Sequence, residues 1–209
     1  MANEGEKDVG RNKERTKQRF LDAVEEILTT KGIGGLKVND IAKIAGLDKK
    51  LIYKYFGGTE QLMDEYIQSK DFWSNVKGEK VPDVITDGGQ AFIEEMLLLQ
   101  FDHVARDKAF QKLLLWRLTE QRKSLQKLTD AQEANGETLL RRITDPHFES
   151  QSAQFRAIMA LLIGGAYYLD LYAAVNGSTF CGIDLATEPG RDEIKKALAF
   201  LLNSAYKDL

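Results

Sequence analysis

Residues 38–56 constrain this chain more than any other stretch, because they carry two short amphipathic helical patterns joined by a sharp turn. In both halves, apolar residues recur at the i, i+3 and i+4 spacing that lines one face of an α-helix. They are Ile41, Ala42 and Ala45, then Ile52, Tyr55 and Phe56. Gly46 can adopt the positive φ that a tight turn requires. The pattern predicts a helix-turn-helix, whose second helix enters the major groove of DNA.

The combined spacing also resembles a known family. Ile41-Ala42, Ala45-Gly46-Leu47 and Ile52-Tyr53-Lys54-Tyr55-Phe56, with Glu60 and Leu62 behind them, are similar to the DNA-binding segment of tetracycline-repressor-like (TetR-type) regulators. The resemblance implies an all-α fold of about nine helices, in which a three-helix helix-turn-helix DNA-binding domain precedes a larger helical effector-binding and dimerisation domain.

Charge and cysteine content limit the other classes. A net charge of −3 does not exclude DNA binding, because a small basic module can sit on a larger acidic body. Cys181 is the only cysteine, and His103 and His147 lack metal-like spacing, so we expect no metal and no cofactor. There is no charged-then-apolar leader, and the uncharged run 157–169 is shorter than the about 20 residues of a membrane span. We therefore expect a cytoplasmic protein.

We expect the DNA-binding domain to occupy residues 1–57, with residues 1–10 as a disordered arm. The effector-binding and dimerisation domain then occupies residues 58–209, and a break rich in charge, glycine and proline falls at residues 77–82. The first helix is predicted over about residues 12–31. Its early turns carry basic side chains that face either DNA phosphates or plain solvent, namely Arg11, Lys13, Arg15, Lys17 and Arg19.

Contacts with DNA are expected from the two helices of the predicted helix-turn-helix. The candidates are Lys37, Asn39, Asp48, Lys49, Lys50, Tyr53 and Lys54. Asp48 is a good N-cap residue, and a lysine at position 50 can donate to guanine or to phosphate. Compared with common family members, Lys37 replaces a threonine N-cap, Lys50 a glycine, and Thr59 a phosphate-contacting lysine. The resemblance therefore supports DNA binding more firmly than it supports any one contact.

The remainder of the chain reads as helical by its apolar period. After a helix over residues 59–75, in which Phe72 and Trp73 pack on the larger domain, helices are predicted over residues 84–105, 108–123, 125–143, 152–175 and 191–206, with a loop over residues 176–190.

The helix over residues 152–175 is apolar on almost every side and must be covered on every side. One chain's core covers one face, so we expect a second copy to cover the other, as the resemblance also implies. The candidate interface residues are Leu161, Gly164, Gly165, Tyr168, Leu198, Leu201 and Leu202. A homodimer would present two recognition helices to a palindromic operator.

A pocket for a small-molecule effector is implied by the resemblance. Its candidate lining residues are Phe92, Met96, Gln100, Phe110, Trp116 and Tyr168, although plain core packing is the more common role for such side chains. Asp170 is an acid within an apolar run and needs a partner if it is buried. An arginine or tyrosine of a second subunit, a ligand cation, or simple exposure would each satisfy it.

The leading hypothesis is a homodimeric repressor released from DNA by a small molecule. The first alternative is a dimeric DNA-binding protein without an effector, which would share the same N-terminal motif. The second is a small helical enzyme, which would need an acid–base pair or a metal site. Glu94 and Glu95 point in different directions on a helix and the histidines are isolated, so we expect no enzyme activity.

Overall fold

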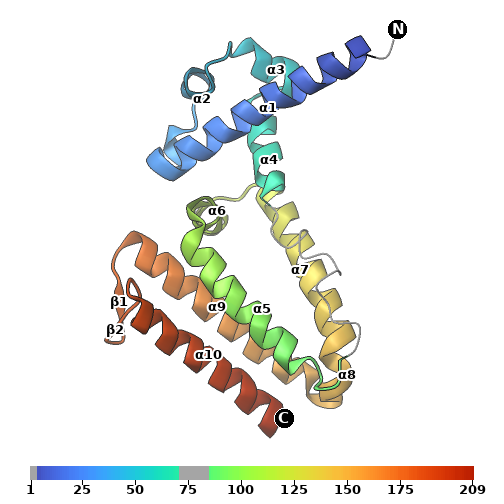
Figure 1. Cartoon of the computed structure of the whole chain (residues 1–209), viewed down its shortest axis with the longest axis vertical. Coiled ribbons are helices and arrows are strands. Elements are labelled where there is room, and N and C mark those ends of the chain that lie inside the picture. Colours follow the sequence, from blue (N-terminus) through green and yellow to red (C-terminus); the bar gives the residue numbers. More distant parts are fainter. Residues whose placement is uncertain (1–3, 71–84) are drawn as a thin grey trace. The chain divides into compact units, whose positions relative to one another are not determined.

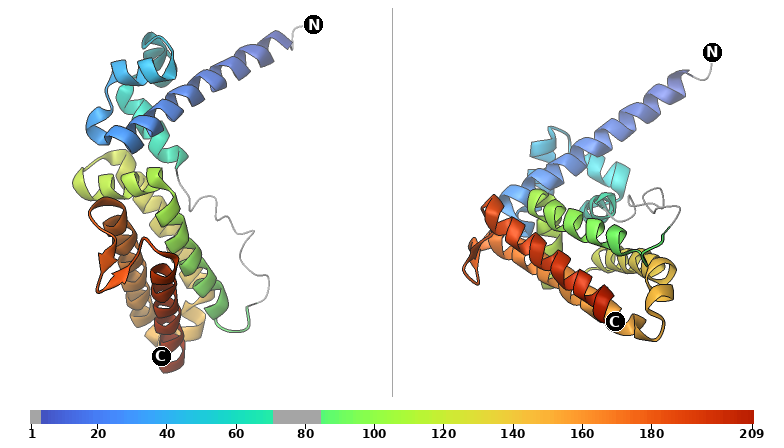
Figure 2. Two further views of the ribbon diagram at one scale, coloured as in Figure 1. Left: turned by 60° about the vertical axis from the view of Figure 1, so that its left-hand side comes forward. Right: turned by 60° about the horizontal axis from the view of Figure 1, so that its bottom comes forward.

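The computed structural model describes residues 4–70 and 85–209, with side chains from residue 11 onward. The described chain is helical apart from one two-residue hairpin (Figure 1), so the predicted all-α class is confirmed. By their contacts the residues form two compact units, which are Met1–Asp71 with Lys112–Thr129, and Phe72–Gln111 with Asp130–Leu209. Figure 2 gives two further views of the ribbon.

The first unit is built on four N-terminal helices. These are α1 (Glu4–Lys31), α2 (Val38–Ala45), α3 (Lys50–Phe56) and α4 (Thr59–Ser69), with a 3₁₀ turn at Ile33–Gly35 between the first two. Helix α1 begins at Glu4, well before the predicted residue 12. No proline interrupts residues 4–10, so the helix can continue backward through them.

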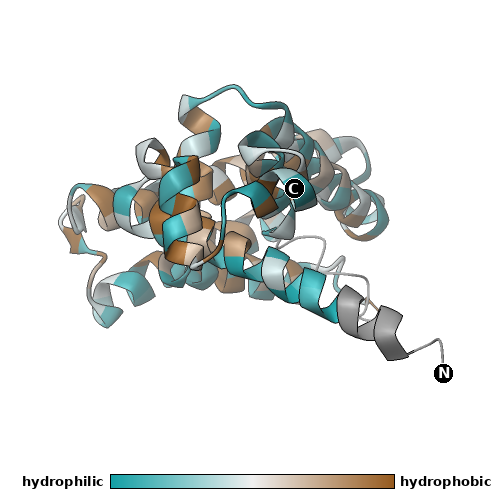
Figure 3. Ribbon diagram, turned by 90° about the horizontal axis from the view of Figure 1, so that it is seen from above, coloured by the Kyte–Doolittle hydropathy of each residue, from teal (hydrophilic) through white to brown (hydrophobic). Residues whose placement is uncertain are grey.

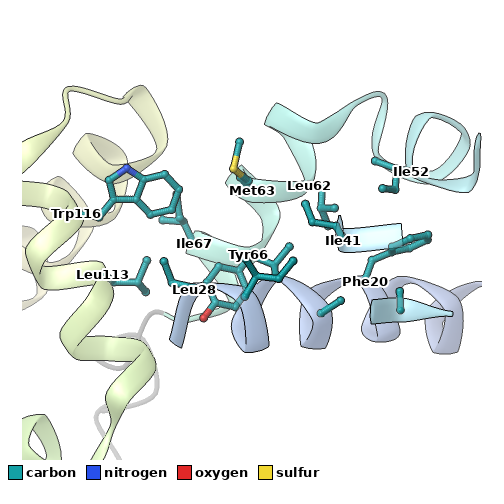
Figure 4. Close-up of a cluster of buried hydrophobic side chains, with 14 of the residues drawn as sticks. Phe20, Leu28, Ile41, Ile52, Leu62, Met63, Tyr66, Ile67, Leu113 and Trp116 are labelled. Atoms are coloured by element: carbon teal, nitrogen blue, oxygen red, sulfur yellow. The ribbon is translucent and has the colours of Figure 1, made fainter. Parts of the chain in front are cut away.

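A single hydrophobic cluster holds these helices together (Figure 4). Phe20 and Leu28 of α1, Ile41 of α2, Ile52 of α3 and Leu62 of α4 are all fully buried in it. The cluster also includes Leu113, Trp116, Leu125 and Leu128, which come from later in the chain. Isolated helices as short as α2 and α3 are marginal in water. The side chains from later in the chain therefore add to the packing that holds these two helices in place.

Later helices are α5 (Gln90–Arg106), α6 (Lys108–Thr119), α7 (Lys123–Ile143), the single turn α8 (Asp145–Phe148), α9 (Ser152–Val175) and α10 (Glu188–Asp208). Only α9 has the predicted bounds at both ends. In the second unit α9 packs against α5 and α10. Their shared core includes Phe101 and Leu202, which are fully buried, and a stacked pair formed by Phe148 and Phe155.

The predicted loop over residues 176–190 is partly ordered structure. Strands β1 (Thr179–Phe180) and β2 (Ile183–Asp184) pair in an antiparallel hairpin. Cys181 and Gly182 both have positive φ in its turn, which is the geometry of a two-residue type I′ hairpin. Helix α10 then starts three residues earlier than predicted, because Thr187 caps it by accepting a hydrogen bond from the Gly190 amide.

Figure 3 colours the ribbon by the hydropathy of each residue. By length and composition alone, the helical segment Asp145–Val175 could cross a membrane; it is longer than the uncharged run weighed in the sequence. Core helices of soluble proteins meet the same criterion. The predicted end of the fourth helix at residue 75, the packing of Phe72 and Trp73, and the break at residues 77–82 lie outside the described residues.

Candidate nucleic-acid interface and ligand cavity

The turn between α2 and α3 is fixed by backbone geometry and by an arginine. Gly46 ends α2 in the left-handed conformation, with φ 63°. The Leu47 amide donates to the Ala42 carbonyl at 3.1 Å, a hydrogen bond typical of a glycine-terminated helix. Arg19 Nη2 of α1 donates to the Ala45 carbonyl at 2.7 Å. A cation on the negative end of the helix dipole stabilises that end.

Two of the five basic residues predicted as a phosphate-facing patch therefore make contacts inside the protein. Arg19 binds the end of α2, as described above. Lys17 pairs with Glu65 at 2.5 Å and lies 5.1 Å from the centre of the Phe56 ring. These contacts hold α1 against α2, α3 and α4. Arg11, Lys13 and Arg15 are exposed, so the phosphate-facing prediction stays open for them.

Helix α3 presents a polar face and buries an apolar one. Ile52 is fully buried, whereas the Tyr53 side chain is 55% exposed, and Lys49, Lys50 and Lys54 are exposed as well. The Tyr53 phenol is therefore outside the core, as the spacing predicted. Lysine ammonium groups and a phenol on one exposed helix face are donors suited to phosphate oxygens and base edges.

Asp48 acts on its own helix. Its Oδ1 accepts a hydrogen bond from the Lys50 amide at 2.8 Å, which satisfies a backbone donor of the first turn. Asp48, one of the predicted DNA-contacting residues, therefore helps to fix the start of α3 through this hydrogen bond. At the start of α2, Lys37 and Asn39 are exposed, and no side chain caps that end. Lys49 Nζ lies 3.2 Å from Asn39 Oδ1 and links the two helices.

Charge is distributed unevenly along the chain. Residues 37–56 contain five lysines and two aspartates, although the whole chain has a net charge of −3. The local excess of positive charge is on the helices whose polar faces are exposed. A basic patch on a small module is the electrostatic signature expected of a nucleic-acid interface.

A cavity of about 100 Å³ lies within the second unit. Its lining residues come from α5, α7 and α9 and are Phe92, Ile93, Met96, Leu97, Gln100, Gly136, Leu139, Leu140, Met159 and Ile163. The structure thus brings together three of the six predicted lining residues, Phe92, Met96 and Gln100. The α7 and α9 residues were not predicted. A spacing of i, i+4 for Met159 and Ile163 puts them on one face, but period alone does not separate a cavity wall from a filled core.

The other three predicted lining residues lie elsewhere. Trp116 is buried in the cluster of the first unit (Figure 4), and its indole nitrogen donates to Glu120 at 2.7 Å. Phe110 packs against His103. Tyr168 is 56% exposed and contacts Phe180 of the hairpin edge-on. Tertiary packing places each of these three side chains away from this cavity.

The predicted interface residues divide into two groups. Leu161, Gly164, Gly165, Tyr168 and Leu201 are exposed. Leu198 and Leu202 are buried in the core of their own chain, so they present little surface to a second copy. On α10 the helical period turns these two inward and leaves Leu201 outward together with Phe200, which is 69% exposed and was not predicted.

Asp170 is buried and has its partner within the same chain. Its Oδ1 accepts a hydrogen bond from Arg191 Nη1 at 2.8 Å, and the guanidinium also faces Asp102 and the Phe101 ring. Lys195 pairs with Asp102 at 2.8 Å. Burial raises the pKa of the Asp170 carboxyl to about 6, and Arg191 offsets that effect only in part. The described residues include no group of three or more His, Cys, Asp or Glu side chains arranged to hold a metal.

Comparison with known proteins agrees with this geometry. Residues 20–66 match the family model described as bacterial regulatory proteins, tetR family. Two uncharacterized helix-turn-helix-type transcriptional regulators, from Mycobacterium tuberculosis strains CDC 1551 and H37Rv, are each 35% identical over 57 residues. That match covers 27% of this chain and 28% of each relative.

Two solved structures share the fold over most of the chain. The first is a Rhodococcus sp. protein described as a candidate TetR-family transcriptional regulator, with a TM-score of 0.56 and 16% identity, over 92% of this chain and 99% of that one. The second is the multidrug binding protein EbrR complexed with proflavin, with a TM-score of 0.51 and 20% identity, over 89% of this chain and 99% of that one.

Proposed function

Because the chain belongs to the TetR family of transcriptional regulators, we propose that it is a homodimeric repressor which a small-molecule effector releases from a palindromic operator. The family assignment confirms the resemblance seen in the sequence, and the family is one of regulators, not enzymes. The observation that carries the proposal is the amphipathic character of α3. Its exposed side carries Lys49, Lys50, Tyr53 and Lys54, while Ile52 on the opposite side is buried. We assign DNA contact to these residues and to Lys37 and Asn39. We also propose that the protein acts in the bacterial cytoplasm.

A second copy of the chain would supply the cover that α9 lacks. Only 28% of the most apolar window of the Asp145–Val175 segment is buried within one chain. Leu161 is 76% exposed, and the neighbouring Gly164 and Gly165 have open space where a side chain would be. Exposed apolar surface of this kind marks an interaction site, and small residues let a helix approach closely. A two-fold dimer would present one α3 to each half-site of an operator.

Release by an effector requires that the molecule bind one dimer geometry more tightly than the other. The cavity between α5, α7 and α9 is the proposed effector site. EbrR, which shares the fold, was crystallised with proflavin, so a ligand site within this fold has a precedent. A binding preference of about 1–3 kcal/mol between the two geometries would change operator occupancy several-fold. We keep residue 57 as the proposed end of the DNA-binding domain, although α4 packs against α1 and α3 in the same unit.

DNA binding by the purified protein tests the proposal. A labelled duplex from the region upstream of the protein's own gene should bind, and the affinity should fall steeply with added salt because counterions are released on binding. A duplex of shuffled sequence is the control. Equal affinity for both duplexes would contradict an operator-specific regulator, while specific binding that no cavity ligand alters would favour a DNA-binding protein without an effector.

A further inference from the structure

We propose that the cavity between α5, α7 and α9 selects a small, neutral, largely apolar molecule with no more than one six-membered ring. The inference rests on the proposed function only in taking this cavity as the effector site. The cavity measures about 100 Å³. An apolar cavity of roughly 150 Å³ in another protein stays dry and binds benzene, so this smaller cavity admits at most one ring and excludes fused multi-ring compounds.

The walls determine the polarity of the ligand. Among the described lining residues, Gln100 alone carries a hydrogen-bonding side chain; the others are aliphatic, aromatic, thioether or glycine. The Gln100 amide donates to the Tyr167 hydroxyl and is 5% exposed. Because the Gln100 amide is already hydrogen-bonded to Tyr167, the wall favours a molecule that is largely apolar.

Charged molecules would enter this cavity without a counter-ion. No described lining residue is charged. The buried charges elsewhere in the unit already neutralise one another, since Arg191 pairs with Asp170 and Asp102, and Lys195 pairs with Asp102. A charge moved from water into such a site loses its hydration and gains no partner. Binding of an ion should therefore be at least tenfold weaker than binding of a neutral analogue of the same shape.

Gly136 offers a way to fill the cavity. It lies within α7 and lines the cavity, and a Cβ atom added there would have no neighbour within 4 Å. A phenylalanine at this position would thus take up open space without a backbone clash. Ala134 lies on the same helix, is exposed and does not line the cavity. Gly136→Phe and Ala134→Phe therefore form a matched pair.

The test uses three probes of nearly equal size: benzyl alcohol, benzylamine, which is a cation at neutral pH, and benzoate. Binding to the full chain is followed by ligand-observed NMR titration. Benzyl alcohol should bind at least tenfold more tightly than either ion. Gly136→Phe should weaken benzyl alcohol binding at least tenfold, and Ala134→Phe should leave it within twofold of wild type. Circular dichroism establishes that both variants are folded.

Several results would overturn the inference: no binding of benzyl alcohol, equal binding of either ion, or unchanged binding by a folded Gly136→Phe variant. The three-probe comparison uses the wild-type chain, so it does not depend on the variant's folding. DNA affinity is measured separately by fluorescence anisotropy. Loss of specific DNA binding would contradict the proposed regulator without touching ligand selectivity, whereas an ion that binds equally well would contradict the selectivity alone.

Discussion

At the scale of single residues, Asp170 shows how a buried charge is tolerated in the helical core. It is 2% exposed, and only one of its two carboxylate oxygens has a hydrogen-bond partner among the described residues. An incompletely paired buried charge costs free energy. The sequence indicated that Asp170 needs a partner, but it could not identify Arg191, because the two are brought together by the packing of α9 on α10.

The raised pKa makes a prediction about pH. In the unfolded chain Asp170 loses its proton near its ordinary pKa of 3.8, while in the folded chain it holds the proton until about pH 6. The folded state binds more protons across that window, so its stability falls as pH rises through it. Replacing Asp170 by Asn removes this contribution. The free energy of unfolding of wild type minus that of the variant should fall by roughly 1–3 kcal/mol from pH 4 to pH 7.

Urea denaturation at several pH values measures this difference. Asp145 is a suitable comparison, because Arg156 lowers the pKa of its carboxyl below 3.8. The difference for Asp145→Asn should therefore stay nearly constant from pH 4 to pH 7, and should fall only as the pH is lowered below that range. A difference for Asp170→Asn that is constant between pH 4 and pH 7 would mean that the carboxyl is not perturbed by burial.

At the scale of elements, the sequence predicts the features that depend on local pattern. Helices α2 and α3 and the turn at Gly46 follow from apolar spacing and glycine placement, and the bounds of α9 follow from its long apolar run. The hairpin over residues 179–184 was missed, because two-residue strands leave no periodic signal. Three of the six predicted lining residues line the cavity. The others could not be separated from core residues, because the side of a buried helix that faces a cavity is set by neighbours distant in sequence.

The turn at Gly46 can be tested directly. Gly46→Ala should lower the free energy of unfolding by about 1–2 kcal/mol, since a Cβ is strained at positive φ and would lie 3.0 Å from Arg19 Nη2. Gly136→Ala is the matched control. It lies inside a helix without such strain, so it should raise stability by about 0.5–1 kcal/mol. Denaturant titration of both variants measures the effects; equal signs would contradict the role given to Gly46.

At the scale of the whole molecule, the account depends on a second copy of the chain. The exposed apolar residues of α9 and α10, among them Leu161, Phe200 and Leu201, need cover, and a palindromic operator needs two reading heads. A monomer could carry the basic patch of residues 37–56, but it could not select the spacing of two half-sites. The proposed dimer would thus convert a DNA-binding motif into a regulator of chosen sites.

Leu161→Glu should convert the dimer into a monomer, because it places a charge where an apolar contact is proposed. Leu118 is the matched control, since it is 78% exposed, much like Leu161, and lies on α6, outside the proposed interface. Light scattering at micromolar concentration should report a dimer for wild type and for Leu118→Glu. A monomeric wild-type protein, or a Leu161→Glu variant that stays dimeric, would show that α9 is not the interface.

The central claim is that the exposed face of α3 binds DNA. Its most direct test compares two triple variants of equal charge change, Lys49, Lys50 and Lys54 to Gln against Lys108, Lys127 and Lys207 to Gln, by fluorescence anisotropy with operator DNA at several salt concentrations. The account predicts that the first variant loses at least about tenfold in affinity and depends less steeply on salt, while the second remains close to wild type. Unchanged affinity and salt dependence in the first variant would contradict the claim.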